Sequence, residues 1–126
     1  MKNLQDIIQE KLQIGSKTKV SGYKYRPKYK GELKGLLGKL LDERGKNANL
    51  NDIDTSEITD MSYLFYNLDP HNINISAWDV SNVKDMRIMF DGCENFNSDL
   101  SKWDVSNVIN MYSMFSNCKK FNSNLN

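Results

Sequence analysis

The sequence WDVSNV at residues 78–83 occurs again, letter for letter, at residues 103–108. Around this pair the chain repeats every 25 residues, and a more divergent copy has Ile53 where the others have tryptophan. Methionine and phenylalanine keep the same register, at Met61, Met86 and Met111 and at Phe65, Phe90 and Phe115. A fixed period of this length indicates repeats that stack and bury their apolar faces against their neighbours.

Each repeat contains two local periods. Trp103 and Val105 alternate with polar residues, as in a strand with one buried face, whereas the three- and four-residue spacing from Met86 to Cys93 is typical of a short helix. We therefore expect an α/β fold: a short leucine-rich-repeat-like solenoid of parallel strands and short helices. It would span residues 46–126, with three repeats and the start of a fourth.

The polar columns are expected to be framework. The asparagines at positions 47, 72, 97 and 122 would satisfy backbone groups of neighbouring turns. Asp54, Asp79 and Asp104 recur in every copy and would bond nearby turn amides, and Ser56, Ser81 and Ser106 would cap the helices. Cys93 and Cys118 share a column with Leu68, so buried free thiols are favoured, although a disulfide stays open in an oxidising compartment.

The first third of the chain does not follow the repeat in the same way. Residues 1–45 are expected to form an N-terminal cap with an amphipathic helix around Leu4–Leu12, a basic extended segment over Lys17–Lys30 and a leucine-rich helix over Gly31–Gly45. The inward leucines of that helix would be Leu33, Leu36, Leu37, Leu40 and Leu41. Stacked repeats need such a cap for solubility.

The repeat motif also carries a family resemblance. WDVSNV, followed by Met89, Phe90, Cys93 and Phe96, resembles the bacterial leucine-rich repeats of the BspA-like surface-protein family over about residues 47–126. The resemblance implies adhesion to host proteins by chains that are mostly secreted or lipid-anchored.

Enzymatic chemistry has little support in the sequence. His71 is the single histidine, and a Cys–His pair with Cys93 is less plausible than a turn residue in a divergent repeat. Two cysteines and one histidine cannot complete a zinc site without carboxylates. We expect no catalytic, cofactor-binding or metal-binding residues.

The charge is unevenly distributed. Residues 1–50 contain twelve basic and five acidic side chains, and the rest of the chain contains five basic and eleven acidic ones. The basic segment alternates with Tyr23, Tyr25 and Tyr29, which favours inward tyrosines and solvated lysines over a strip that stacks on nucleic-acid bases. An anionic partner could still bind there through charge.

Partner-binding residues are expected where the copies differ. The candidates are Tyr63, Arg87, Ile88, Lys102, Ile109 and Tyr112 on the repeats and Lys24, Arg26, Lys28 and Lys30 on the basic segment. Ordinary drift on a solvated surface is an equal alternative.

These observations favour a non-enzymatic protein–protein interaction module, such as a small binding, inhibitor or adaptor protein of a bacterium or a mobile element such as a phage. The alternatives are a surface adhesion module and, more weakly, a nucleic-acid-associated protein. The start of the chain shows no signal-peptide-like run or lipidation cysteine, and no stretch is apolar enough to span a bilayer, so a cytoplasmic location is expected unless a leader was removed. The last complete repeat, with Trp103, is expected to be open to a partner or to self-association.

Overall fold

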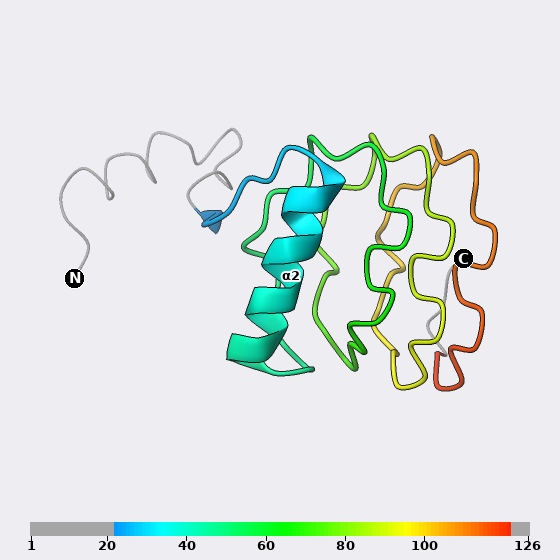
Figure 1. The fold of residues 1–126 in the computed structure, drawn as a ribbon. Helices are drawn as coiled ribbons and strands as arrows, with labels where there is room; N and C mark the ends of the chain where they lie inside the picture. The colour runs from blue at the N-terminus through cyan, green and yellow to red at the C-terminus, as the bar shows by residue number, and fades with distance from the viewer. Residues whose placement is uncertain (1–21, 122–126) are drawn as a thin grey trace, which may run out of the picture.

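A computed structural model of the chain describes residues 22–121. Within that range the backbone forms one helix, α2 (Lys30–Arg44), followed by turn-rich coils and no strand. We define coil 1 as residues 47–71, coil 2 as residues 72–96 and coil 3 as residues 97–121. Figure 1 shows α2 lying alongside the coils, with coil 3 at the opposite end of the stack. The amphipathic helix expected around Leu4–Leu12 lies outside the described residues.

The leucine-rich helix is confirmed within one residue at each end. Its buried residues are Leu33, Leu37, Leu40 and Leu41, and Leu36 is partly buried against the same core. Their three- and four-residue spacing places them on one side of α2, which therefore faces the coils. The helix stops at Gly45, whose φ of 93° is readily adopted only by glycine and whose N–H bonds the Leu41 carbonyl at 2.9 Å.

The predicted solenoid of parallel strands and short helices is wrong. The pairing that exists consists of isolated parallel bridges between Asn49 and Asn74, Asp60 and Asp85, Asp85 and Asn110, and Tyr25 and Ile53. The first three join residues 25 positions apart, so the predicted register is present without the predicted ladder. The fold over residues 46–121 is a stack of irregular coils.

Polar side chains explain why no strand forms. Asp54, Asp79 and Asp104 each accept a hydrogen bond from the N–H two residues later, at 3.0 Å in every copy. An amide that is already bonded to the aspartate two residues earlier cannot join a hydrogen-bond ladder with the next coil. The prediction that these aspartates bond turn amides is confirmed, but the serines that follow them cap no helix. Ser81 and Ser106 instead donate their hydroxyls back to the same aspartates.

Left-handed residues explain why no helix forms after Val83. Ile88 has a φ of 57° and Gly92 a φ of 79°, so two left-handed residues interrupt the chain within five positions. The amide of Ile88 then bonds across to the Tyr112 carbonyl of coil 3 at 2.9 Å instead of bonding within its own segment. The inward residues keep the three- and four-residue spacing because successive turns place them on the core side, as a helix would.

The core is a set of aligned rings. Trp78 and Trp103 stack with centroids 6.4 Å apart and an interplanar angle of 4°. Phe65, Phe90 and Phe115 form a second column, at 5.0 and 5.6 Å. The expectation that equivalent rings from consecutive copies lie on one another is confirmed. Such pairs add about 0.5–1.5 kcal/mol each beyond the area they bury.

Polar contacts between the coils also repeat. The indole N–H groups of Trp78 and Trp103 donate to the carbonyls of Leu50 and Ile75, each 28 residues earlier. Asn47 accepts from the amide of Asn72 at 3.0 Å, as expected of the asparagine column. Asn82 and Asn107 form a second, unforeseen ladder by donating to carbonyls 26 residues earlier, those of Ser56 and Ser81. The indole bonds satisfy buried or partly buried N–H groups without a sheet, whereas the exposed asparagine bonds join neighbouring coils at the surface.

Burial distinguishes the two tryptophans and gives a testable difference. Trp78 is only 4% exposed and stacks on both Phe65 and Trp103, whereas Trp103 is partly buried. We expect Trp78→Ala to lower the free energy of unfolding by about 3–5 kcal/mol and Trp103→Ala to lower it by clearly less. Urea denaturation of the two variants measures this. Equal losses would contradict the described stack.

Candidate functional site

One side of the stack gathers most of the variable candidates. We define the lateral face by Tyr63 of coil 1, Lys84, Arg87 and Ile88 of coil 2, and Ile109 and Tyr112 of coil 3. Backbone bonds set these residues side by side: Tyr63 donates to Arg87, Ile88 to Tyr112 and Ile109 to Lys84, all within 2.9–3.0 Å. Five of the six repeat candidates therefore lie together.

The lateral face exposes large apolar side chains. Ile109 is 85% exposed, Tyr112 73% and Tyr63 42%, and Tyr63 packs edge-on against the ring of Tyr66 at 5.8 Å. Isolated exposed apolar residues are ordinary on protein surfaces, but a group rimmed by charges marks interaction sites.

Backbone conformation turns these side chains outward. Tyr63, Ile88 and Ser113 occupy equivalent positions, and their φ angles are 62°, 57° and 54°. A left-handed residue lets the residue that follows it face the core. Leu64 and Met89 are fully buried for this reason, while Tyr63 beside them is exposed.

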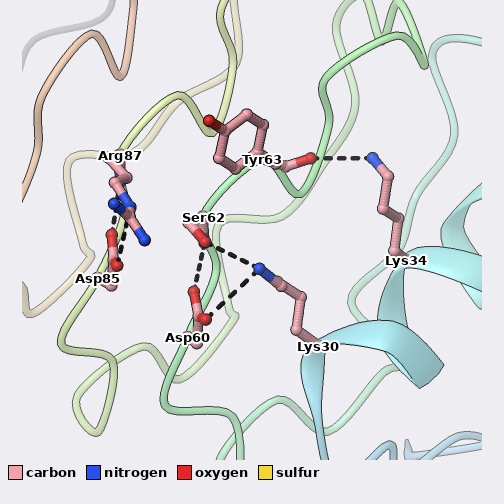
Figure 2. A network of polar contacts seen from close by, with 7 residues as sticks. All are labelled: Lys30, Lys34, Asp60, Ser62, Tyr63, Asp85 and Arg87. Carbon is pink, nitrogen blue, oxygen red and sulfur yellow. Dashed lines mark hydrogen bonds and ion pairs between the residues drawn. The ribbon is translucent and has the colours of Figure 1, made fainter.

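Ion pairs border the face at coils 1 and 2 (Figure 2). Lys30 of α2 donates to the Ser62 hydroxyl at 2.9 Å and lies 3.4 Å from the Asp60 carboxylate. Arg87 pairs with Asp85 at 3.1 Å in the next coil. Burial alone would raise the pKa of Asp60, but hydrogen bonds from Ser62 and the Lys30 charge leave that pKa below its ordinary value. The rim therefore carries charged side chains that are paired with opposite charges.

The basic candidates are split by the structure. Lys30 lies beside the lateral face, and Lys28 lies 3.5 Å from the Glu57 carboxylate. Lys24 pairs through its backbone with Asp52 on another side of coil 1, and Arg26 lies over the Tyr23 ring at 5.9 Å. Lys102 is exposed on coil 3, in the column of Asp52. Lys24, Arg26 and Lys102 therefore do not form one site with the lateral face, whereas Lys30 borders it.

The tyrosines of the basic segment are only partly as expected. Tyr25 packs against the core and bridges to Ile53, but Tyr29 is 66% exposed. The prediction of inward tyrosines is confirmed for Tyr25 and wrong for Tyr29.

Lys34 is a structural residue that the repeat pattern did not reveal. Its ammonium group donates to three carbonyls of coil 1, those of Tyr63, Leu64 and Tyr66, at 2.9, 2.9 and 3.1 Å. Figure 2 shows the bond to Tyr63. Burial lowers its pKa, and the neighbouring Lys30 lowers it further. A lysine four residues after another on an amphipathic helix was the available signal.

The cysteine and histidine side chains contact different partners and not one another. Cys93 and Cys118 are free thiols that donate to the carbonyls of Phe65 and Phe90, while the His71 ring lies 3.4 Å from the Asp69 carboxylate. Burial is the main cause that raises the pKa of Cys93 to about 12, and it also raises the pKa of Cys118. Because the thiolate is the nucleophile, neither thiol is activated in this fold.

The comparisons with known proteins give one family. The model of a family described as "Mycoplasma protein of unknown function, DUF285" matches residues 37–126, which include the second half of α2 and all three coils. The chain belongs to this family. The family is associated with BspA-like repeat proteins. No curated protein and no solved structure matches the chain.

No helix among the described residues 22–121 is long and apolar enough to cross a membrane.

The three bonds of Lys34 give a stability prediction. Lys34→Met keeps the apolar stem but leaves three carbonyls without this donor, so we expect the free energy of unfolding to fall by about 1–3 kcal/mol. Lys39→Met, at an exposed position of the same helix, is the matched control and should change it by less than about 0.5 kcal/mol. Chemical denaturation compares them. If Lys34→Met left the free energy of unfolding unchanged, a structural role of these three bonds would be contradicted.

The thiols give a reactivity prediction. Cys118 is only partly buried, whereas Cys93 is 1% exposed. With iodoacetamide at about pH 8, Cys118 should be alkylated first, and both should react more slowly than in the unfolded chain. Peptide mapping by mass spectrometry identifies the modified site. Alkylation of Cys93 before Cys118 would contradict the described packing.

Proposed function

We propose that this chain is a non-enzymatic protein–protein interaction module that binds its partner through the lateral face. The observation that carries the proposal is the exposure of Ile109 and Tyr112, two large apolar side chains three residues apart on coil 3. Aromatic and apolar anchors of this kind supply most of the binding energy at protein interfaces, and a charged rim supplies orientation.

The contrast between columns supports the same reading. Positions that repeat in every copy, such as Asp54 and Asp79, bond backbone groups within the fold. The lateral face differs in every copy, with tyrosine, isoleucine and serine at one column. Variation on a rigid framework allows a repeat protein to fit a particular partner.

A surface adhesion module of the BspA-like type is the second candidate. Its support is the family match, because that family is associated with BspA-like repeat proteins. In that role the lateral face would bind an extracellular host protein, and the chain would act at the cell surface. In the first role it would bind a protein of its own cell as an inhibitor or adaptor, and would act in the cytoplasm.

A site-directed crosslinking experiment tests the proposal. A photoreactive benzoylphenylalanine replaces Tyr112 in one protein and Tyr29, a similarly exposed tyrosine off the lateral face, in another. Both are irradiated in mycoplasma lysate and, separately, with host extracellular-matrix proteins. A partner captured from position 112 and not from position 29 supports the lateral face, and its source separates the two roles.

The captured partner is then purified for a quantitative test. We expect Tyr112→Ser and Ile109→Ser each to weaken its binding by about tenfold or more, as for interface anchors. Tyr29→Ser should leave the affinity within about twofold. Calorimetry measures all three. Equal losses for Tyr29→Ser and Tyr112→Ser would contradict the proposal.

A further inference from the structure

Cys93 and Cys118 occupy equivalent positions of coils 2 and 3, 25 residues apart. Backbone hydrogen bonds join the two coils on both sides of these positions. The flanking bonds run from Gly92 to Ser116 at 2.8 Å before the cysteines and from Lys120 to Glu94 at 3.2 Å after them. The two cysteines therefore face each other across one coil spacing.

The spacing of the coils at this point suits a disulfide. Three residues before the cysteines, the rings of Phe90 and Phe115 have centroids 5.6 Å apart, and three residues after them the rings of Phe96 and Phe121 are 5.4 Å apart. A disulfide joins residues whose Cα atoms are usually about 4.4–6.8 Å apart. A bridge between the two cysteines therefore fits the stack without separating or compressing its coils.

The thiol of Cys118 already points toward coil 2. Its Sγ donates to the Phe90 carbonyl at 2.9 Å, and the amide of Cys93 donates to the same oxygen at 3.0 Å. The Cys93 thiol points the other way, to the Phe65 carbonyl of coil 1 at 3.5 Å. Because a thiol is a weak hydrogen-bond donor, turning the Cys93 side chain toward coil 3 loses one weak contact. A single rotamer change thus brings the two sulfurs together.

We propose that Cys93 and Cys118 are a redox pair that closes to a disulfide between coils 2 and 3 in an oxidising environment. The free thiols are the reduced form of this pair. With oxidised glutathione as the oxidant, the Cys118 thiolate attacks one glutathione sulfur and releases the first glutathione. The Cys93 thiolate then attacks the Cys118 sulfur and releases the second. The two thiols lose two protons and two electrons, and the oxidant is reduced to two glutathione molecules.

The fold favours the bridge at equilibrium even though it slows the reaction. Burial raises the pKa of both thiols, which lowers the rate of exchange but does not decide how stable the product is. The stability of the bridge depends on how well it fits the folded chain. It also closes a long loop, which removes freedom from the unfolded chain. Oxidation is therefore expected to stabilise the stack.

The redox pair separates the two proposed roles by compartment. Thiols stay reduced in a cytoplasm, whereas disulfides persist outside the cell. An adhesion module at the cell surface would carry the bridge, which would tie Arg87 and Ile88 of the lateral face to Ile109 and Tyr112. A cytoplasmic module would carry the thiols. The bridge is tested without any partner, so its failure would leave the proposed function untouched.

The probe is oxidised glutathione, added to the reduced full chain at about pH 8.5 in native buffer and, separately, in concentrated urea. In the matched variant Cys118→Ala/Lys119→Cys, the second thiol moves by one residue to an exposed position. The loop to Cys93 keeps almost the same length, so an unfolded chain should close either loop equally well. Mass spectrometry with peptide mapping measures the bridged monomer, and thermal unfolding measures Tm.

In native buffer we expect the unmodified chain to form the bridged monomer about tenfold or more faster than the variant, because the stack raises the effective concentration of its thiols. In urea the two rates should agree within about twofold. The bridge should raise Tm by roughly 5 °C or more, and dithiothreitol should reverse the rise.

Four results would overturn the proposal. Equal rates of the two proteins in native buffer would show that the register of the coils does not pair the thiols. Glutathione adducts in place of the bridge, disulfide-linked dimers in place of the bridge, or a lower Tm after bridging would show that the bridge does not fit the stack. The last three results come from the unmodified chain alone, so they decide the question even where the variant does not fold.

Discussion

The structure depends on one constraint: equivalent rings of successive coils must lie on one another. Trp78 and Trp103 are parallel within 4°, and Phe90 and Phe115 within 3°. With these rings aligned, the backbone bonds between coils join residues 24 to 26 positions apart, and a shift by one residue would break that register. The stacking therefore fixes the hydrogen-bond register, which a sheet would otherwise have fixed.

The direction of the bonds between coils makes α2 part of the stack. Along the segment that begins at Met61 and Met86, the amides of one coil donate to the carbonyls of the next, so the carbonyls of this segment in coil 1 face α2 and need donors from it. α2 supplies donors to coil 1. Most of its own N–H groups bond within the helix, so it donates from a lysine side chain instead. Lys34 of α2 and Lys46 just after it both donate to carbonyls of coil 1, a role that the leucine pattern of the helix did not indicate.

The sequence predicted which residues face the core, because inward positions follow from the apolar columns alone. It also predicted α2, whose leucine spacing and terminal glycine are local signals. It failed on the strands and short helices, because turns that change hand produce the same inward spacing as both. The column of Asn67, Gly92 and Asn117 was the available signal, since asparagine and glycine tolerate positive φ and all three adopt it.

The candidate surface was predicted in part. Variation among the copies selected Tyr63, Arg87, Ile88, Ile109 and Tyr112, which the backbone bonds between coils place as neighbours; that they bind a partner stays a prediction. It could not separate Lys102 or the basic segment from them, because exposure and charge do not specify on which side of a coil a residue lies. The sequence did not reveal the bonds of Lys34 for a related reason. Because α2 occurs once, no second copy indicates which of its lysines is structural.

The left-handed column explains how a rigid fold leaves a surface free to vary. Isoleucine at a φ of 57° is strained by about 1–3 kcal/mol, and such a conformation persists only where its surroundings impose it. Here the bonds of Ile88 to Tyr112 and of Tyr63 to Arg87 impose it from the neighbouring coil. Because the backbone hand is set by the neighbour and not by the side chain, tyrosine, isoleucine and serine occupy one column without a change of fold. The side chain at this position is therefore free to vary with the partner that it is proposed to bind.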